Sequence, residues 1–258
     1  MSGFASISAG STALTTPEYG QGVGGSGETG VGEQERGFSD VSEVEPEEES
    51  AVNRAIKNSI AARRRLYLES SGIPKCYWKG LAGYNPQQHP NCAQLLADAK
   101  AWLDLFDPTV AMTGFYFHGN TGSGKTLLAA GIALEVATTK SSKVVWRNTI
   151  SLFQAIRDAW AARQGTVLVD EMVKADLLVL DELGAEQPEP WILTQLYNVI
   201  NTRIERDRGS MIVTSNYDPD TLKEKFGAKG SDIGDRIVSR LRGSLCIPNT
   251  PFPPKDFR

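Results

Sequence analysis

The residues with the clearest chemistry lie in the middle of the chain, where glycines alternate with hydroxyl groups and one lysine. The run matches G-x-x-x-x-G-K-[ST], the phosphate-binding loop of P-loop nucleotidases. Glycines let successive backbone N–H groups turn toward one anion. Lys125 adds a cation for the β- and γ-phosphates, and the Thr126 hydroxyl suits a Mg²⁺ ligand. The predicted ATP-binding residues are Gly119, Asn120, Thr121, Gly122, Ser123, Gly124, Lys125, Thr126 and Leu127.

The segments on either side of this loop predict the strand and the helix that it requires. Residues 115–118 form an aromatic run typical of a strand, and residues 127–137 have the composition of a buried helix. The N-terminus of that helix adds a partial positive charge at the loop. A glycine-rich surface turn, the plain alternative, would need neither neighbour. We therefore expect the chain to bind a nucleotide.

Two carboxylates follow an apolar run further along the chain. Residues 176–182 are typical of a buried parallel strand that ends in acid. Beside a phosphate loop, Asp181 is predicted to hold Mg²⁺, and Glu182 to be the general base that deprotonates water. Asn216, after the predicted strand 211–214, is expected to polarise that water or contact the γ-phosphate. The alternatives are a solvated strand end for the acids and an ordinary turn residue for Asn216.

A pair of arginines lies in a helix predicted over residues 233–242. Arg236 and Arg240 are four residues apart, so they share one helix face. No acidic residue lies four positions from Arg240, so a local salt bridge is not its obvious role. A guanidinium matches the geometry of phosphate. The pattern favours an arginine finger that acts on the nucleotide of a neighbouring subunit, which requires self-association.

Charge is unevenly distributed along the 258 residues. Residues 1–50 carry ten acidic residues against one arginine, a net −9, which leaves +5 for the remainder of a chain whose net charge is −4. A mildly basic folded part is compatible with nucleic acid. Three cysteines far apart in the sequence predict neither a zinc site nor disulfides, as expected for a cytoplasmic protein. No run of 18 apolar residues predicts a membrane span.

The chain is predicted to have three parts. Residues 1–50 are rich in glycine, serine and glutamate, which predicts a disordered acidic tail, either solubilising or acting as a docking or autoinhibitory arm. Residues 51–72 predict a helical linker or partner-binding segment. Its arginines, Arg63–Arg65, either face solvent or contact DNA or a partner. Residues 73–258 predict the ATPase domain.

Within that domain, strands and helices alternate. Such alternation predicts an α/β fold with a doubly wound parallel sheet and its ligand at the carboxyl ends of the strands. The further strands are predicted at residues 143–147, 211–214 and 245–247, and the further helices at 93–106, at 150–163, from Pro190, from Pro219 and at 233–242.

These motifs together resemble a known family. The strings GNTGSGKT, LLVLDELGAE, MIVTSNYDPDTL and GDRIVSRLRGS, with the terminal residues 255–258, are similar to the AAA+ ATPase domain of DnaC/DnaI-type replicative helicase loaders. They resemble IstB-type transposition ATPases less closely. The similarity covers residues 72–258. It implies the roles of Walker A for Lys125 and Thr126, Walker B for Asp181 and Glu182, sensor 1 for Asn216, arginine finger for Arg240 with Arg236 beside it, and sensor 2 for Arg258.

The resemblance also implies a function and partners. The chain would be an ATPase that loads a ring-shaped, DnaB-like replicative helicase onto single-stranded DNA, acting as an ATP-bridged oligomer. Arg157 and Trp160 fall at positions that would face DNA in such loaders, and Trp191 is a further candidate. An arginine for the backbone and aromatic rings for base stacking suit binding without sequence preference. For both tryptophans, packing within the protein is the alternative.

Other functions remain compatible with the sequence. An IstB-type ATPase would assemble on duplex DNA and position a transposase. A nucleotide-gated adaptor would use the same pocket with little turnover. A small-molecule kinase fits least, because no arginine-rich lid is apparent and the Asp181–Glu182 pair suits activation of water.

Overall fold

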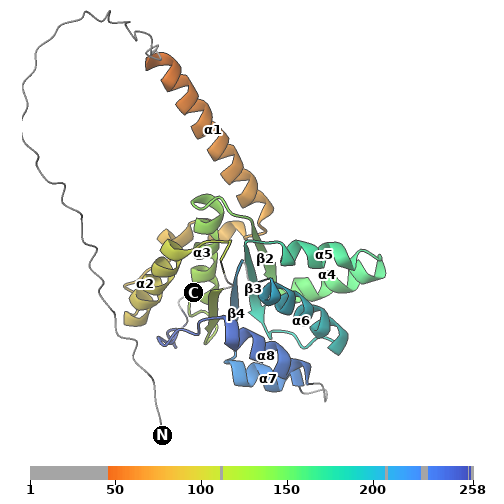
Figure 1. The fold of residues 1–258 in the computed structure, drawn as a ribbon. Coiled ribbons are helices and arrows are strands. Elements are labelled where there is room, and N and C mark those ends of the chain that lie inside the picture. Colours follow the sequence, from red (N-terminus) through yellow and green to blue (C-terminus); the bar gives the residue numbers. More distant parts are fainter. Residues whose placement is uncertain (1–45, 111–112, 207–208, 228–231, 255, 257–258) are drawn as a thin grey trace, which may run out of the picture. The chain divides into compact units, whose positions relative to one another are not determined.

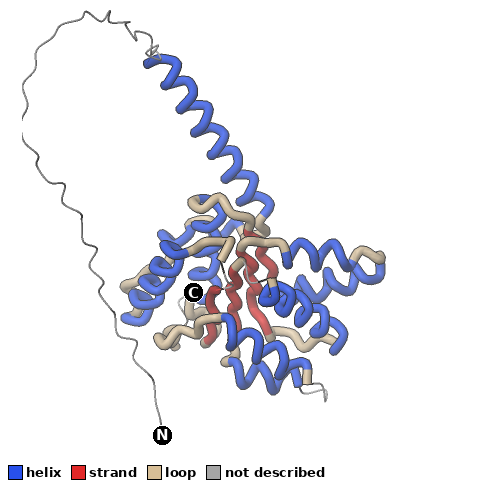
Figure 2. The backbone as a smooth tube through the Cα atoms, in the orientation of Figure 1, coloured by secondary structure: helices blue, strands red, loops and turns tan. Residues whose placement is uncertain are grey.

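A computed structural model describes the chain from Pro46 to Asp256, apart from residues 111–112, 207–208, 228–231 and 255. Within these residues, four parallel strands form one sheet with helices on both faces (Figures 1 and 2). The strands are β1 (Thr113–His118), β2 (Val144–Asn148), β3 (Leu177–Leu183) and β4 (Ser210–Ser215). Their nearly continuous apolar runs fit strands that are covered on both faces. The predicted α/β fold with a parallel sheet is confirmed.

The order of the strands brings the predicted site residues together. The sheet runs β1-β4-β3-β2, so β4 lies between the strand that enters the phosphate loop and the strand that ends in acid. His118 at the end of β1 is in register with Ser215 of β4, and Asn148 at the end of β2 is in register with Asp181. The carboxyl ends of all four strands therefore meet at one edge of the sheet.

Helices on the two faces of the sheet enclose two apolar cores. One core lies against α2 and α3, and the other against α4, α5, α6 and α8 (Figure 1). The described helices are α1 (Pro46–Ser70), α2 (Pro90–Leu105), α3 (Lys125–Thr138), α4 (Thr149–Ala161), α5 (Gly165–Val173), α6 (Pro190–Glu205), α7 (Pro219–Gly227) and α8 (Ile233–Ser244), with 3-10 turns η1 (Lys75–Tyr77) and η2 (Gly80–Gly83).

Helical spacing predicts apolar, core-facing sides for two helices, made of Leu95, Leu96, Ala99, Trp102 and Leu103 in α2 and of Leu193, Leu196, Tyr197, Ile200 and Ile204 in α6. Both are confirmed. Leu95, Ala99 and Leu103 of α2 are buried, as are Leu193 and Leu196 of α6. By contrast, α1 exposes residues 51–66, and only its last turn packs against the α2–α3 core. In the described residues no helix has both the length and the apolar character needed to cross a membrane.

The structure differs from the sequence-based expectation at three places. Residues 245–247 do not form a closing strand: Cys246 makes only a single bridge to Phe115 of β1. Pro248 follows at once, and a proline has no N–H with which to continue a ladder. Helix α5 was not predicted. Helix α1 begins at Pro46, inside the segment predicted as tail, and residues 1–45 lie outside the described part of the chain.

Candidate active site

The phosphate loop joins the end of β1 to the start of α3. Gly122 and Gly124 adopt left-handed conformations, with φ of 77° and 94°, which most other residues adopt only with strain. A Cβ at Gly122 would lie 2.0 Å from a carboxylate oxygen of Asp256, so the loop also has no room there. The Lys125 Nζ atom donates to the carbonyls of Gly119 and Asn120, at 2.8 and 2.7 Å. The loop is thus shaped by glycine and held closed by its own lysine.

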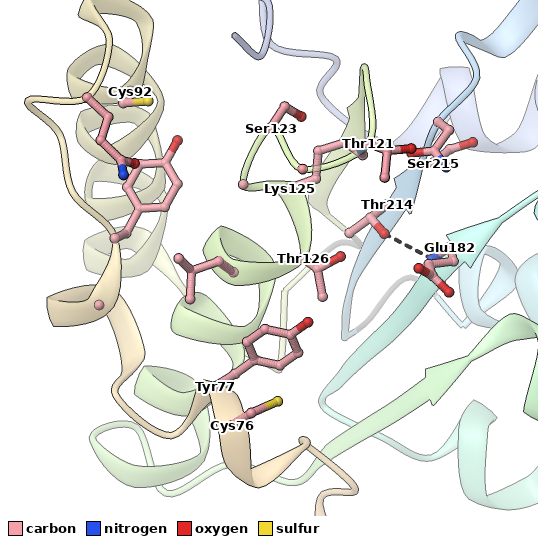
Figure 3. A pocket seen from close by; sticks show the side chains of 17 residues that line it. Cys76, Tyr77, Cys92, Thr121, Ser123, Lys125, Thr126, Glu182, Thr214 and Ser215 are labelled. Atoms are coloured by element: carbon pink, nitrogen blue, oxygen red, sulfur yellow. Dashed lines mark hydrogen bonds between the residues drawn. The ribbon is translucent and has the colours of Figure 1, made fainter. Parts of the chain in front are cut away.

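The loop borders a cavity of about 470 Å³ (Figure 3). Residues 121–127 form one wall, and Glu182 and Asn216 lie on another. The buried Ser123 hydroxyl has no hydrogen-bond partner among the described residues, which leaves a donor available at the loop. Backbone N–H groups, an ammonium and a free hydroxyl are the groups that bind phosphate. The residues present therefore fit the phosphate groups of a nucleoside triphosphate.

The residues predicted to bind Mg²⁺ meet at the end of β3. Asp181 is 95% buried, and its Oδ1 atom accepts from the Thr126 hydroxyl at 2.9 Å and the Thr214 hydroxyl at 2.6 Å. Burial raises the pKa of the Asp181 carboxyl, while the two hydroxyl hydrogen bonds oppose that shift. A carboxylate beside a hydroxyl supplies the hard oxygen ligands that Mg²⁺ prefers. Thr126 and Asp181 are thus close enough to share one ion.

Glu182 has a backbone conformation that is rare for its residue type. Its φ is +60°, and the register between β3 and β4 shifts between Leu180 and Leu183. A left-handed conformation costs about 1–2 kcal/mol for a residue other than glycine, and such outliers concentrate at functional sites. The Glu182 N–H donates to the Thr214 hydroxyl at 3.0 Å. The bulge leaves the Glu182 side chain exposed and lining the cavity, whereas the Asp181 side chain is buried.

The sequence offers Asn148 or Thr149 as the cap of the helix predicted at residues 150–163. The structure selects Asn148, whose Oδ1 accepts from the Ile150 N–H at 3.1 Å and so caps α4, and this asparagine also contacts Glu182. Its amide Nδ2 donates to the Glu182 carboxylate at 2.8 Å. Sequence reasoning also missed Thr214 of β4, and Tyr77 and Tyr84 from the 3-10 turns before α2, all of which line the cavity. No spacing pattern marks these residues, because elements far apart in the sequence bring them together.

Arg236 and Arg240 do not line this cavity. They border a separate hollow of about 360 Å³ between α6 and α8, together with Tyr197, Asp235 and Ser239. The Arg236 guanidinium carbon lies 4.3 Å from the centre of the Tyr197 ring. The two arginines therefore share one face, as predicted. Arg258, predicted as sensor 2, lies outside the described residues.

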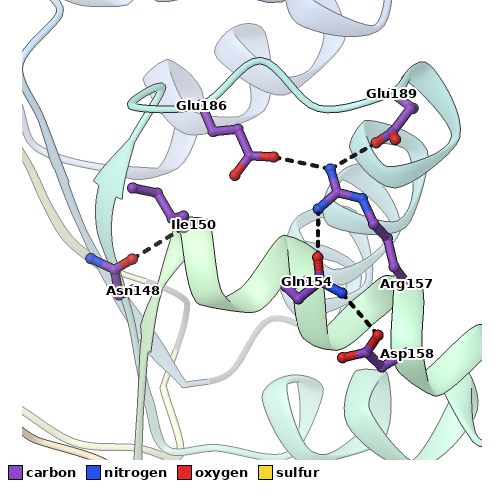
Figure 4. A network of polar contacts seen from close by, with 7 residues as sticks. All are labelled: Asn148, Ile150, Gln154, Arg157, Asp158, Glu186 and Glu189. Atoms are coloured by element: carbon purple, nitrogen blue, oxygen red, sulfur yellow. Dashed lines mark hydrogen bonds and ion pairs between the residues drawn. The ribbon is translucent and has the colours of Figure 1, made fainter.

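The residues predicted to contact DNA lie on α4 and at the start of α6. Arg157 bonds Glu186 at 3.0 Å and Glu189 at 2.9 Å, and more weakly Gln154 at 3.4 Å (Figure 4). The hydrogen bonds that Arg157 donates to these carboxylates, first to Glu189 and then to Glu186, raise the pKa of Arg157. This guanidinium already has two counter-ions within the chain.

The two tryptophans contact each other beside this network. Their ring centres are 6.2 Å apart. Trp160 covers Gly165 so closely that a Cβ there would lie 2.3 Å from the indole ring. Trp160 is half-buried, while Trp191 is 41% exposed. Packing within the protein thus covers much of the Trp160 side chain and less of the Trp191 side chain.

A strand, a phosphate loop and a helix, followed by an acidic pair and an asparagine at the tips of adjacent strands, define a P-loop nucleotide-binding domain with the AAA+ fold. The family model for IstB-like ATP binding proteins matches residues 78–242, and the chain belongs to that family.

Comparisons with individual proteins agree with this class. The chain is 30% identical over 163 residues to the replicative helicase loader DnaI of Bacillus subtilis, covering 59% of this chain and 50% of DnaI. It is 25% identical over 150 residues to the replicative helicase loader DnaC of Escherichia coli K12, covering 57% and 56%. The chain thus spans about half the length of these relatives.

Solved structures share the fold at lower identity. A crystal structure of DnaI matches with a TM-score of 0.61 and 22% identity, covering 68% of this chain and 93% of that one. DnaA from Aquifex aeolicus, bound to AMPPCP, matches with a TM-score of 0.56 and 18% identity, covering 69% and 53%. At these identities the likeness establishes the AAA+ fold alone.

Proposed function

We propose that this chain is an ATP-hydrolysing loader that places a ring-shaped, DnaB-like replicative helicase on single-stranded DNA. The ATPase part rests on one cluster of side chains at one edge of the sheet. There Thr126, the last residue of the phosphate loop, lies beside Asp181, Glu182 and Asn216. The helicase part is supported by similarity to two proteins named as replicative helicase loaders.

In this proposal each residue of the cluster has one task. The loop N–H groups and Lys125 bind the β- and γ-phosphates, and Thr126 and Asp181 hold Mg²⁺. Held by these two residues, the ion would supply positive charge beside the phosphate oxygens, where negative charge develops during hydrolysis. Glu182 accepts a proton from water at its carboxylate, and Asn216 orients that water. An arginine of a second copy, Arg240, completes the site.

The three predicted parts of the chain have separate roles in the proposal. Residues 73–258 form the ATPase domain, residues 51–72 bind a partner, and residues 1–50 form an acidic tail. The middle part is supported by Val52, Ile56 and Ile60, which are 58%, 51% and 42% exposed on α1. Apolar side chains exposed at helical spacing suit contact with another protein.

A loading assay tests the proposal as a whole. The replicative helicase of the organism that encodes the chain is mixed with closed circular single-stranded DNA, ATP and the full chain. We expect DNA-bound helicase to increase with the wild-type chain and not with Lys125→Ala. If both proteins leave the amount of bound helicase unchanged, the loader proposal is wrong.

The family match also favours a second candidate, an IstB-type ATPase that acts in transposition. Such a protein would assemble on duplex DNA in an ATP-dependent manner. Sedimentation with duplex and single-stranded DNA of equal length separates the two candidates. Preference for duplex, without capture of the helicase, would favour the transposition ATPase.

The role of Glu182 is tested within the same chain. Glu182→Gln keeps the size and polarity of the side chain but removes the base. We expect ATP hydrolysis to fall at least ~10²-fold while binding of a fluorescent ATP analogue stays near wild type. Lys125→Ala is the matched control that loses binding itself. Hydrolysis at the wild-type rate in Glu182→Gln would remove Glu182 from the mechanism.

A further inference from the structure

Tyr197 lies under the arginine pair of α8. It projects from α6 into the hollow that Arg236 and Arg240 border, and its ring centre is 4.3 Å from the Arg236 guanidinium carbon. The other side of the ring packs against the core beneath α6. Hydrogen bonding with Arg236, and then with Arg240, lowers the pKa of the Tyr197 phenol. Arg236 thus lies over this ring, and Arg240 borders the same hollow one helical turn further along α8.

The charged neighbours of the pair are paired with other residues. Asp235 bonds Lys223 at 3.1 Å, and Arg242 bonds Asp220 at 2.7 Å. In the part of the chain that the structure describes, no carboxylate pairs with Arg236 or Arg240. Among the groups around these two guanidinium groups, the ring is therefore the one placed to orient them.

An aromatic support differs chemically from a carboxylate support. A carboxylate orients a guanidinium but also neutralises it and occupies its N–H groups. A ring face and a phenol oxygen hold the cation without neutralising it, and most of the five N–H groups of a guanidinium remain available to an incoming anion. A free arginine side chain samples many rotamers, so an arginine without such support would be aligned only part of the time.

We propose that Tyr197 is a positioning residue that aligns Arg236, and with it Arg240, for the triphosphate of a nucleotide bound by a second copy of the chain. The inference rests on the proposed function, because it requires that these arginines act between subunits. Tyr197 itself contacts no nucleotide in this arrangement. It acts through the arginines alone.

Two substitutions separate the ring face from simple packing. Tyr197→Phe keeps the ring and removes the hydroxyl, while Tyr197→Leu keeps apolar contact with the core and removes the ring. With Tyr197→Leu we expect a roughly tenfold loss of DNA-stimulated ATP turnover, in proportion to a lost cation–π contact. Tyr197→Phe should stay within about threefold of wild type. Nucleotide binding by the isolated subunit should not change in either variant.

Self-assembly gives a readout that does not depend on turnover. With a non-hydrolysable ATP analogue and single-stranded DNA, sedimentation measures the protein concentration at half assembly. We expect this midpoint to rise several-fold for Tyr197→Leu and to stay near wild type for Tyr197→Phe. An unchanged midpoint and an unchanged turnover in Tyr197→Leu would overturn the inference.

A double-mutant cycle excludes a structural effect. In an Arg236→Ala and Arg240→Ala background, Tyr197→Leu should cause no further loss, because the groups that it positions are gone. A further loss of the same size would mean that Tyr197 supports the fold, and the inference would fail. If the arginine substitutions alone leave assembly and turnover unchanged, the bridging part of the proposed function fails and the inference with it.

Discussion

Two faces of the molecule carry arginines predicted to bind phosphate, and they support those arginines differently. On α4, Arg157 lies between Glu186 and Glu189, which hold it at 3.0 and 2.9 Å. On α8, Arg236 rests on the ring of Tyr197 at 4.3 Å. The first arginine is neutralised within its own chain, whereas the second has no carboxylate partner among the described residues.

The difference shows that the position of an arginine does not by itself define a phosphate site. An anion that reaches Arg157 must displace two carboxylates and overcome their repulsion. Around the hollow that Arg236 and Arg240 border, the one acid is Asp235, which is already paired with Lys223 at 3.1 Å, so an incoming anion displaces no carboxylate from either arginine. We therefore expect the α8 face to respond strongly to loss of an arginine, and the α4 face to respond to loss of its acids.

The largest effect is expected on α8. A finger that acts on a neighbouring subunit contributes only in the assembly, and its loss can cost about 10³-fold in turnover. Arg240→Ala should bind ATP like the wild-type chain yet lose DNA-stimulated hydrolysis by up to ~10³-fold. Arg242→Ala, which removes an arginine paired with Asp220 on the same helix, is the matched control and should retain activity.

Mixing variants tests whether Arg240 acts between subunits. Lys125→Ala subunits keep Arg240 but lack a working pocket, and Arg240→Ala subunits have the reverse defect. A mixture should recover activity that neither protein has alone. Absence of recovery, in mixtures that sediment together on DNA, would mean that Arg240 acts within its own subunit.

A smaller effect of opposite sign is expected on α4. Glu186→Gln combined with Glu189→Gln keeps the shape of the network but removes the two counter-charges from Arg157. Affinity for single-stranded DNA should rise by about tenfold at low salt, and the gain should shrink as salt screens the new contact. Fluorescence anisotropy with a labelled oligonucleotide measures both quantities.

The same experiment has a direct control. In an Arg157→Ala background, the two glutamine substitutions should change DNA affinity little beyond the general effect of removing negative charge. An equal gain in that background would show that the acids repel DNA without involving Arg157. The predicted DNA role of Arg157 would then lose its support.

The nucleotide site could be predicted well because its parts follow simple rules. A phosphate loop has a fixed pattern, and apolar runs mark buried strands whose ends must meet in a parallel sheet. For that reason the places of Lys125, Asp181 and Asn216 follow from sequence alone. The strand predicted at residues 245–247 was wrong, because α8 continues to Ser244 and Pro248 ends any ladder.

Contacts between distant elements could not be predicted in this way. The acids that hold Arg157 lie 29 and 32 residues further along the chain, in the irregular segment before α6. Tyr197 was expected to face the core, and it does so with one side while the other supports Arg236. Such contacts depend on loop paths and helix crossing, for which a single sequence offers no periodic signal.

The smallest expected effect concerns Asn148, which connects α4 to the catalytic carboxylate predicted at Glu182. This residue caps α4, the helix that carries Arg157, and its amide donates to the Glu182 carboxylate at 2.8 Å. A base held in this way is less available to accept a proton from water. Asn148→Ser keeps a helix cap, because serine accepts from the same backbone N–H groups, but its shorter side chain lacks the amide that reaches Glu182.

We expect Asn148→Ser to raise ATP turnover in the absence of DNA by about threefold, a modest gain because a net hydrogen bond is worth about 1 kcal/mol. Stimulation by DNA should fall by a similar factor if binding at α4 normally releases the same contact. Thermal unfolding measures whether the cap is kept. A lower basal rate with an unchanged melting temperature would mean that Asn148 aligns Glu182 for catalysis. The contact from α4 would then assist hydrolysis, contrary to our expectation that it restrains hydrolysis.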